Sequence, residues 1–218
     1  MNKSKTLNKE NILDIFIDYI EKNKKRAQKL AQLAEFSNID IEEFSIYYKN
    51  VFEIEKSLYT EIFKQTIITL ESDTAYSSYN SRLKLLSFYY TFFENIDFNT
   101  ELFEILFLDI KSKIASISSF GELKKNFTNY IASLNIEWID FKYPKANNIS
   151  KKAIEELAWG QLLLTLQYWA SDRLEGREKT DIFIEKSVNT TFDVIDVAPL
   201  KSVIDLGKFL FKEKFQMN

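Results

Sequence analysis

The stretch Ala27–Ile54, AQKLAQLAEFSNIDIEEFSIYYKNVFEI, decides the fold. Two short helical patterns flank a break at Ser37 and Asn38, and the apolar residues of each pattern can face the other. Asp40 stands where the N-cap of the second helix is expected, and Glu43 follows three residues later, as in a capping box. Two short helices joined by a tight turn predict a helix-turn-helix, whose second helix can lie in a DNA major groove.

This stretch resembles the DNA-binding domain of the TetR family of bacterial repressors. Leu33 and Ala34 stand where the family has Ile-Ala, and Tyr47-Tyr48 stand for the Tyr-Phe that ends its recognition helix. The turn glycine is replaced by Asn38, which tolerates a positive φ, and the phosphate-contacting tyrosine is replaced by Ser45. Residues 178–215 also look like the C-terminal domain of a subgroup of these proteins. The resemblance implies a TetR-like fold at both ends of the chain.

Composition favours an all-α protein. The 218 residues include 19 Phe and 11 Tyr but only four Gly and two Pro, too few to punctuate many strands and turns. Cys and His are absent, which removes thiolate and imidazole metal ligands and the commonest general base. We therefore expect no metal, no cofactor and no enzymatic activity, although Tyr and carboxylates around a pocket leave an enzyme as a third hypothesis.

Helical periodicity organises the chain into two expected domains. Residues 1–52 form a three-helix, helix-turn-helix DNA-binding domain, and residues 53–218 form a larger ligand-binding and dimerisation bundle. Apolar residues at three- and four-residue spacing predict one long helix over Val51–Ser72. Ser150 is expected to cap a helix over Ala153–Trp169.

The candidate DNA-binding residues lie on the second short helix and in the basic segment before the first. That segment has five cations between residues 22 and 29 without an acid among them, which suits either a phosphate-contacting rim or a solvated helix end. The recognition helix itself is acidic, with Glu42 and Glu43, whereas groove readers usually present Arg, Lys, Asn or Gln. The residues expected at DNA are Lys25, Arg26, Lys29, Asp40, Ile41, Ser45, Tyr47 and Lys49.

The aromatic residues of the second domain have two interpretations. They are core packing, or they line a pocket between helices for an apolar effector, as the TetR resemblance implies. The candidate ligand-binding residues are Tyr89, Phe93, Phe107, Tyr130, Trp159, Tyr168 and Trp169.

The resemblance implies a cytoplasmic transcriptional regulator that binds double-stranded operator DNA as a homodimer and is released by a small apolar effector. The expected dimer interface is the last two long helical segments, Ser150–Ser171 and Lys179–Leu210 with a break before Pro199, although packing within one chain explains their patterns equally well. No apolar run reaches the roughly 18 residues of a membrane span. The alternative is a TetR-fold protein that has lost DNA binding and binds a lipid-like ligand or a protein partner, which the acidic recognition helix favours.

Overall fold

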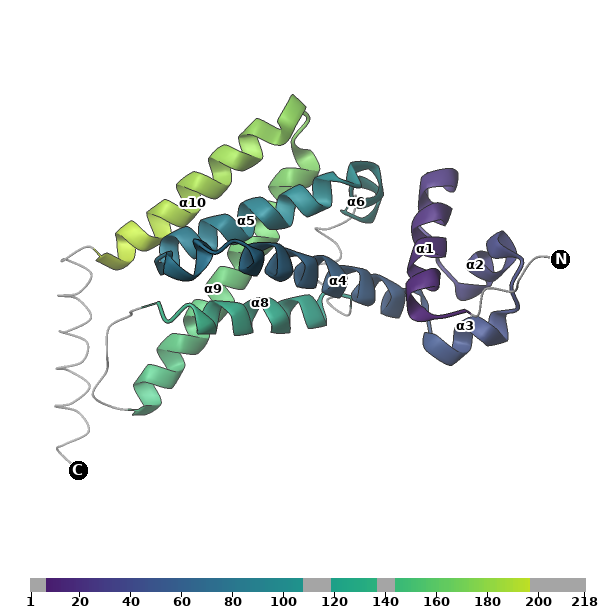
Figure 1. Ribbon diagram of the computed structural model, residues 1–218, viewed down its shortest axis with the longest axis horizontal. Coiled ribbons are helices and arrows are strands. Elements are labelled where there is room, and N and C mark those ends of the chain that lie inside the picture. The colour runs from purple at the N-terminus through teal and green to yellow at the C-terminus, as the bar shows by residue number, and fades with distance from the viewer. Residues whose placement is uncertain (1–6, 108–118, 137–143, 197–218) are drawn as a thin grey trace. The chain divides into compact units, whose positions relative to one another are not determined.

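The computed structural model describes residues 7–107, 119–136 and 144–196, and this part of the chain is all helical, without a strand. Its α-helices are α1 (Lys9–Asn23), α2 (Leu30–Ser37), α3 (Ile41–Tyr47), α4 (Val51–Ser72), α5 (Ser81–Asp97), α6 (Thr100–Phe107), α8 (Gly121–Ser133), α9 (Pro144–Ser171) and α10 (Glu178–Asp196) (Figure 1). The short 3₁₀ turns Tyr76–Ser78 and Glu175–Arg177 precede α5 and α10. The predicted all-α, TetR-like fold class is confirmed.

The chain divides into two compact units. The first contains residues 1–69 and 91–126, and the second contains residues 70–90 and 127–218. The helices α4, α5 and α8 therefore contribute residues to both units, because one end of each belongs to the first unit and the other end to the second.

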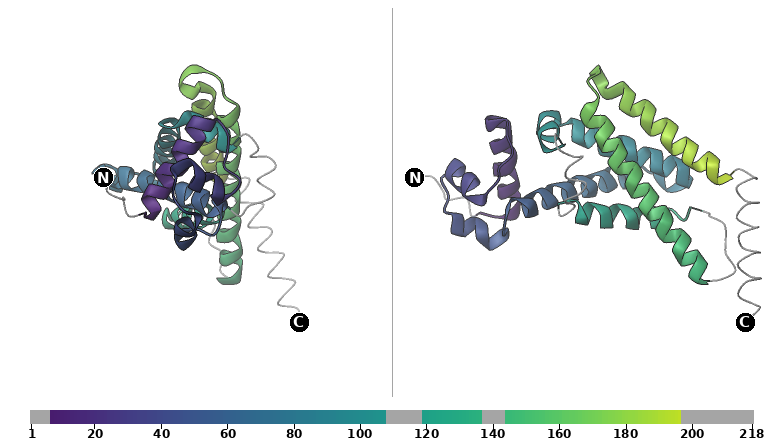
Figure 2. Two further views of the ribbon diagram at one scale, coloured as in Figure 1. Left: turned by 90° about the vertical axis from the view of Figure 1, so that its right-hand side faces the viewer. Right: turned by 180° about the vertical axis from the view of Figure 1, so that it is seen from behind.

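The first unit begins with three helices packed in chain order, α1 on α2 and α2 on α3 (Figure 2). Ile12, Phe16 and Ile20 of α1 are fully buried at the helical spacing that the sequence shows, as is Ile54 near the start of α4. Asn8 caps α1, because its side-chain oxygen accepts a hydrogen bond from the amide of Asn11 at 2.8 Å. These helices form the part of the unit that carries the candidate DNA-binding residues.

The second unit contains a helical hairpin of α9 and α10, which lie against each other. The turn between them depends on Gly176, whose φ of 69° suits glycine. Buried Asp172 accepts hydrogen bonds from the amides of Leu174 and Thr180 and from the Thr180 hydroxyl, at 2.9–3.1 Å. The hairpin is thereby fixed at its closed end.

One predicted boundary is wrong. The helix α9 begins at Pro144, so Ser150 lies inside the helix and does not cap it. Proline suits the first helical position, because its φ is already helical and its missing N–H would have no partner there. The expected helix from residue 179 to about Asp193 corresponds to α10, and the separate final helix predicted from Pro199 lies outside the described residues.

Candidate DNA-binding surface and aromatic core

The turn between α2 and α3 is made by Asn38, which adopts the left-handed conformation with φ 53° and ψ 44°. The amide of Ile39 then donates to the Ala34 carbonyl at 3.1 Å, which satisfies one of the carbonyls at the end of α2. Asparagine tolerates this conformation better than most residues other than glycine. The expected role of Asn38 as a replacement for the turn glycine is consistent with this geometry.

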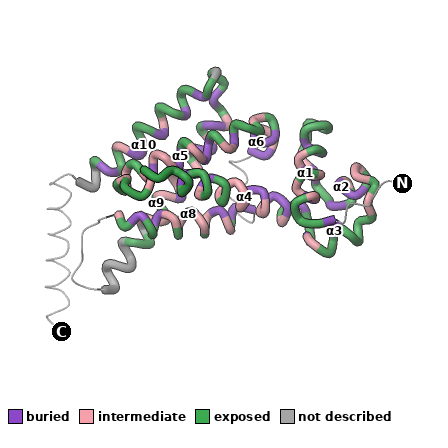
Figure 3. The backbone as a smooth tube through the Cα atoms, in the orientation of Figure 1, coloured by how far each residue is buried: buried purple, intermediate pink, exposed green. Residues whose placement is uncertain are grey.

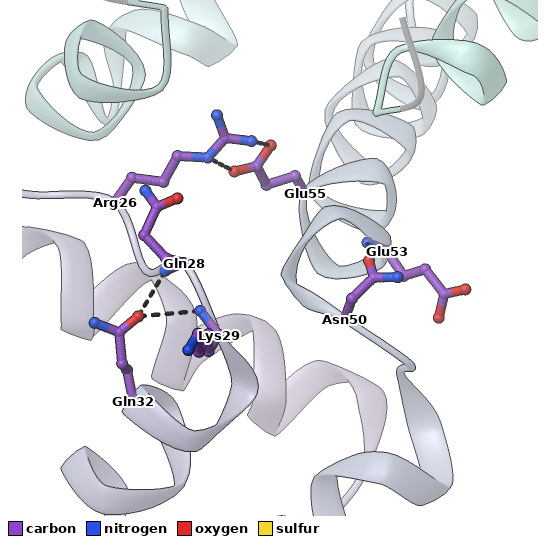
Figure 4. Close-up of polar contacts among 7 residues, drawn as sticks. All are labelled: Arg26, Gln28, Lys29, Gln32, Asn50, Glu53 and Glu55. Carbon is purple, nitrogen blue, oxygen red and sulfur yellow. Dashed lines mark hydrogen bonds and ion pairs between the residues drawn. The ribbon is translucent and has the colours of Figure 1, made fainter. Parts of the chain in front are cut away.

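The start of α2 is capped in a way that the sequence pattern did not indicate. The side-chain oxygen of Gln32 accepts hydrogen bonds from the backbone amides of Gln28 and Lys29, at 2.7 and 3.0 Å (Figure 4). In contrast, Asp40 occupies the N-cap position of α3, but its carboxylate makes no capping hydrogen bond within the described helices. The expected capping box at Asp40 and Glu43 is therefore wrong in its side-chain bonding, although α3 begins where it predicted.

The helix α3 buries one face and exposes the other (Figure 3). Phe44 is fully buried, and the hydroxyl of half-buried Tyr47 donates to the Leu7 carbonyl at 2.6 Å. The exposed residues of the helix are Ile41, Glu42, Glu43, Ser45 and Ile46. Of the candidate DNA-binding residues on this helix, Ile41 and Ser45 thus face solvent. Tyr47 instead hydrogen-bonds to the backbone of Leu7, which precedes α1.

The remaining candidates in this region are three exposed lysines and one paired arginine. Lys25, Lys29 and Lys49 are exposed. The guanidinium of Arg26 forms an ion pair through two nitrogens with both carboxylate oxygens of Glu55 in α4 (Figure 4). It also lies 5.3 Å from the centre of the Phe52 ring. Arg26 therefore joins the segment before α2 to α4.

Glu55 is a functional candidate that sequence reasoning missed. Its side chain is fully buried, at a position of α4 that continues the apolar stripe from Val51 to Leu58. Burial raises the pKa of the neighbouring Tyr59 well above its usual range, the negative charge of Glu55 raises it further, and Arg26 lowers it. The sequence signal for this buried pair was an acidic residue within an apolar stripe. An acidic side chain is almost never fully buried without a partner, so its position indicated a buried ion pair.

The candidate ligand-binding residues divide between the two units. Phe93 and Phe107 belong to the first unit and are buried, and Phe107 stacks with Tyr59 at 6.0 Å between ring centres. The other five belong to the second unit: Tyr89, Tyr130, Trp159, Tyr168 and Trp169. The predicted set is therefore divided between the two units.

Within the second unit, Tyr130 has polar contacts to two other residues. Its hydroxyl lies 2.8 Å from the hydroxyl of Tyr76 and donates to the Lys84 carbonyl at 2.9 Å. The Tyr130 ring stacks on Phe88 at 4.8 Å between ring centres. Burial, followed by the interaction with Tyr76, raises the pKa of Tyr130, and burial alone raises that of Tyr89. Both phenols therefore stay protonated at neutral pH, and the Tyr130 proton is the one that it donates to Lys84.

The two tryptophans and Tyr168 of α9 lie in different environments. Trp159 and Trp169 are buried, and the guanidinium of Arg177 lies 4.3 Å from the centre of the Trp169 ring. Tyr168 is 42% exposed and stacks on Phe183 of α10 at 4.7 Å. Tyr168 thus belongs to the outer surface of the hairpin, beside exposed Leu164 one turn earlier.

The described residues contain no cluster of acidic side chains that could hold a metal ion, and none of their helices is long and apolar enough to cross a membrane.

The fold and these surfaces define a class of all-α protein in which two short helices and a tight turn precede a larger aromatic helical region. Comparison with protein families gives the particular family: residues 84–210, more than half of the chain, match the family described as tetracyclin repressor-like, C-terminal domain. The chain belongs to this family of TetR-like regulators. A search of curated proteins found no match.

Proposed function

We propose that this protein is a TetR-like transcriptional regulator that binds operator DNA as a homodimer and is released by a small apolar effector. The observation that carries the proposal is the exposed face of α3 behind a tight turn at Asn38, in a chain that belongs to the family of TetR-like regulators. Residues 1–52 form the DNA-binding domain in this proposal, and residues 53–218 bind the effector and the second copy. The protein works in the cytoplasm, where the operator lies.

The DNA-binding candidates take three roles in this proposal. Lys25, Lys29 and Lys49 contact phosphates, because they are exposed cations near or before the two short helices. Ile41 and Ser45 face the bases. Arg26, Tyr47 and Asp40 act within the protein or at the start of α3, since Arg26 pairs with Glu55 and Tyr47 bonds to Leu7.

The proposed dimer uses the hairpin of α9 and α10. Leu157, Leu164 and Tyr168 are 68%, 57% and 42% exposed and follow one another at seven- and four-residue spacing, which is one face of α9. Ile182 of α10 is 50% exposed. A two-fold interface needs a self-complementary patch, and an apolar stripe on a helical hairpin provides one.

The proposed effector site lies among the aromatic side chains, where the Tyr89 hydroxyl can orient an otherwise apolar molecule and the Tyr130 ring adds apolar surface. Release of DNA requires that the effector bind the released conformation more tightly than the DNA-bound conformation. An effector with equal affinity for both conformations would leave DNA binding unchanged.

The test is selection of bound sequences from a random duplex pool, followed by fluorescence anisotropy on the enriched duplex at several salt concentrations. We expect a salt-dependent complex of two protomers with one duplex. A Lys25→Ala, Lys29→Ala variant should bind more weakly to every sequence, whereas Lys64→Ala, which removes an exposed lysine of α4, should bind as the unchanged protein does. A dimer that enriches no sequence and binds no DNA at low salt would refute the proposal.

A second candidate function is a TetR-fold protein that binds a lipid-like ligand or a protein partner and no DNA. The acidic residues of the three N-terminal helices α1–α3, which we call the head, favour it, because Asp40, Glu42 and Glu43 are exposed and Lys24 is paired with Glu101. Lipid that co-purifies with the protein, together with no enrichment of DNA sequences, would support this function over the first.

A further inference from the structure

The exposed face of α3 has a defined order of chemical groups. At about 100° per residue, Ile41 and Ile46 lie about 140° apart around the helix, with Ser45 and Glu42 between them. We call these four residues the outward arc. The two isoleucines are 39% and 76% exposed, and Ser45 and Glu42 are exposed as well. The arc therefore presents an apolar group at each edge, with a hydroxyl and a carboxylate in the middle.

We propose that the outward arc reads the pyrimidine edges of the operator: Ile41 and Ile46 contact thymine methyl groups, and Glu42 accepts a hydrogen bond from the amino group of a cytosine. This inference rests on the proposed function, in which α3 enters the major groove of operator DNA. It names the bases that this helix recognises.

The chemistry of the major groove supports this assignment. The thymine C5 methyl is the apolar group that a base pair presents there, and apolar side chains recognise it by contact. A carboxylate accepts from the cytosine N4 amino group, but guanine offers it only the acceptors O6 and N7. Adenine offers an amino group beside the acceptor N7, which repels a carboxylate. Glu42 therefore favours cytosine.

The composition of α3 excludes the usual purine contacts from this helix. Its sequence, IEEFSIY, contains no Arg, Lys, Asn or Gln, the residues that bond guanine and adenine through two hydrogen bonds. The Ser45 hydroxyl donates to the Ile41 carbonyl at 2.9 Å, so its oxygen can still accept a hydrogen bond. The arc thus offers DNA only acceptors and apolar surface.

The length of the arc sets the spacing of the contacts. Five residues at about 1.5 Å of rise separate Ile41 from Ile46 by about 7.5 Å along the helix axis. Base pairs follow one another at about 3.4 Å. The two thymine methyls are therefore expected about two base-pair steps apart in each half-site, with the cytosine between or beside them.

The first experiment removes methyl groups from the selected duplex. Deoxyuridine replaces thymine at single positions in both half-sites, which deletes only the C5 methyl, and the affinity is measured by anisotropy. We expect a loss of about fourfold for each contacted methyl, from the free energy of burying one methylene-sized group. Ile46→Ala should abolish the loss at one position. The matched control is Ile68→Ala, which truncates an isoleucine of α4 that is 49% exposed. This variant should show the same losses of affinity on deoxyuridine substitution as the unchanged protein.

The second experiment separates base recognition by Glu42 from its charge. Glu42→Gln and Glu43→Gln remove the same charge from the same helix, but Glu43, which is also exposed, lies about 60° beyond Ile46 and so outside the outward arc. Both variants should bind DNA more tightly, because a carboxylate near phosphates is repulsive. Only Glu42→Gln should change the selected base at one position, from cytosine toward adenine, since glutamine bonds N6 and N7 of adenine.

The outcomes distinguish this inference from the proposed function. Affinity that falls with deoxyuridine at two positions, and a base preference that shifts only with Glu42→Gln, support the assignment. Specific binding that tolerates deoxyuridine everywhere, or identical selections for both glutamine variants, overturns the assignment and leaves the regulator intact. No specific DNA binding by the unchanged protein, as expected for a protein-binding surface, overturns both.

Discussion

Replacing Arg26 by alanine tests whether its role is structural. The partner of Arg26, Glu55, is fully buried, and the arginine side chain itself is 15% exposed. The Arg26→Ala variant would keep a buried carboxylate while removing the cation that neutralises it. Breaking a buried pair on one side costs about 3–5 kcal/mol. Since a protein has only about 5–15 kcal/mol of stability, we expect a large loss for a single side chain on a connecting segment.

The matched control lies two residues earlier. Lys24 also forms an ion pair, with Glu101, but these side chains are 58% and 56% exposed. An exposed pair contributes about 0–1 kcal/mol, so Lys24→Ala should change stability little. A double variant, Arg26→Leu with Glu55→Leu, removes both charges at once and should recover most of the loss, because a buried pair and apolar residues of similar volume are comparable in stability.

Urea unfolding, monitored by circular dichroism, measures the stability of the three variants. We expect the midpoint of Arg26→Ala to fall well below those of the unchanged protein, Lys24→Ala and the double variant, with an unchanged slope. A loss in Arg26→Ala no larger than in Lys24→Ala would refute the reasoning. A double variant that folds normally but loses DNA affinity would instead show that Arg26 contacts phosphate, as the sequence suggested.

Three further predictions test other parts of the structure. For Asp172, burial raises the pKa of the carboxyl, but hydrogen bonds from Leu174 and Thr180 and the charge of Arg177 outweigh it and lower the pKa overall. The stabilisation by a lowered pKa is present above the unfolded-state pKa of about 3.9 and is lost as pH falls through the folded-state pKa. Asp172→Asn should therefore destabilise the protein by about 1–3 kcal/mol at pH 7. The urea midpoints of the variant and the unchanged protein should converge as pH falls from about 5 toward 3. A difference that stays constant with pH would contradict this. Leu164→Lys should convert the dimer to a monomer in analytical ultracentrifugation, because it buries a charge in the proposed interface, whereas Ile68→Lys should leave the mass unchanged; a dimeric Leu164→Lys would remove α9 from the interface. If Lys25, Lys29 and Lys49 each contact one phosphate, six contacts per dimer give a slope of about −5 for log K against log salt, and Lys25→Ala should make that slope shallower by about 2; an unchanged slope would show that Lys25 does not contact phosphate.

The sequence predicted the elements whose signals are local. The bounds of α4, Val51–Ser72, are those expected, because apolar spacing defines the helix and the polar residues after Ser72 end it. The turn at Asn38 was also predictable, since few residues other than glycine tolerate its positive φ. The prediction that Ser150 caps a helix failed because a residue typical of an N-cap is also tolerated inside a helix. The helix α9 begins earlier, at Pro144.

The charge pairs of the head could not be predicted in the same way. Arg26 and Glu55 are 29 residues apart, and nothing in the local pattern of either residue indicates the other. The run of cations before α2 looked uniform in sequence, but the fold separates it into two kinds. Lys24 and Arg26 form ion pairs with acids of α6 and α4, and only the Arg26 pair is buried, whereas Lys25 and Lys29 are exposed like Lys24.

This separation bears on how an acidic protein can bind DNA. A head whose cations all faced solvent would bind any duplex strongly, because phosphate contacts carry no sequence information. In the proposed regulator, Arg26 is held in a buried pair with Glu55 and Lys24 in an exposed pair with Glu101, which would leave fewer cations for phosphate and place more of the discrimination on the outward arc. If Glu42 lies in the groove as proposed, its carboxylate adds a penalty at every site that offers it no amino group. The negative charge of Glu42 would then both weaken binding to DNA in general and select against wrong sites. Neutralising Glu42 should therefore strengthen binding to non-operator DNA more than binding to the operator.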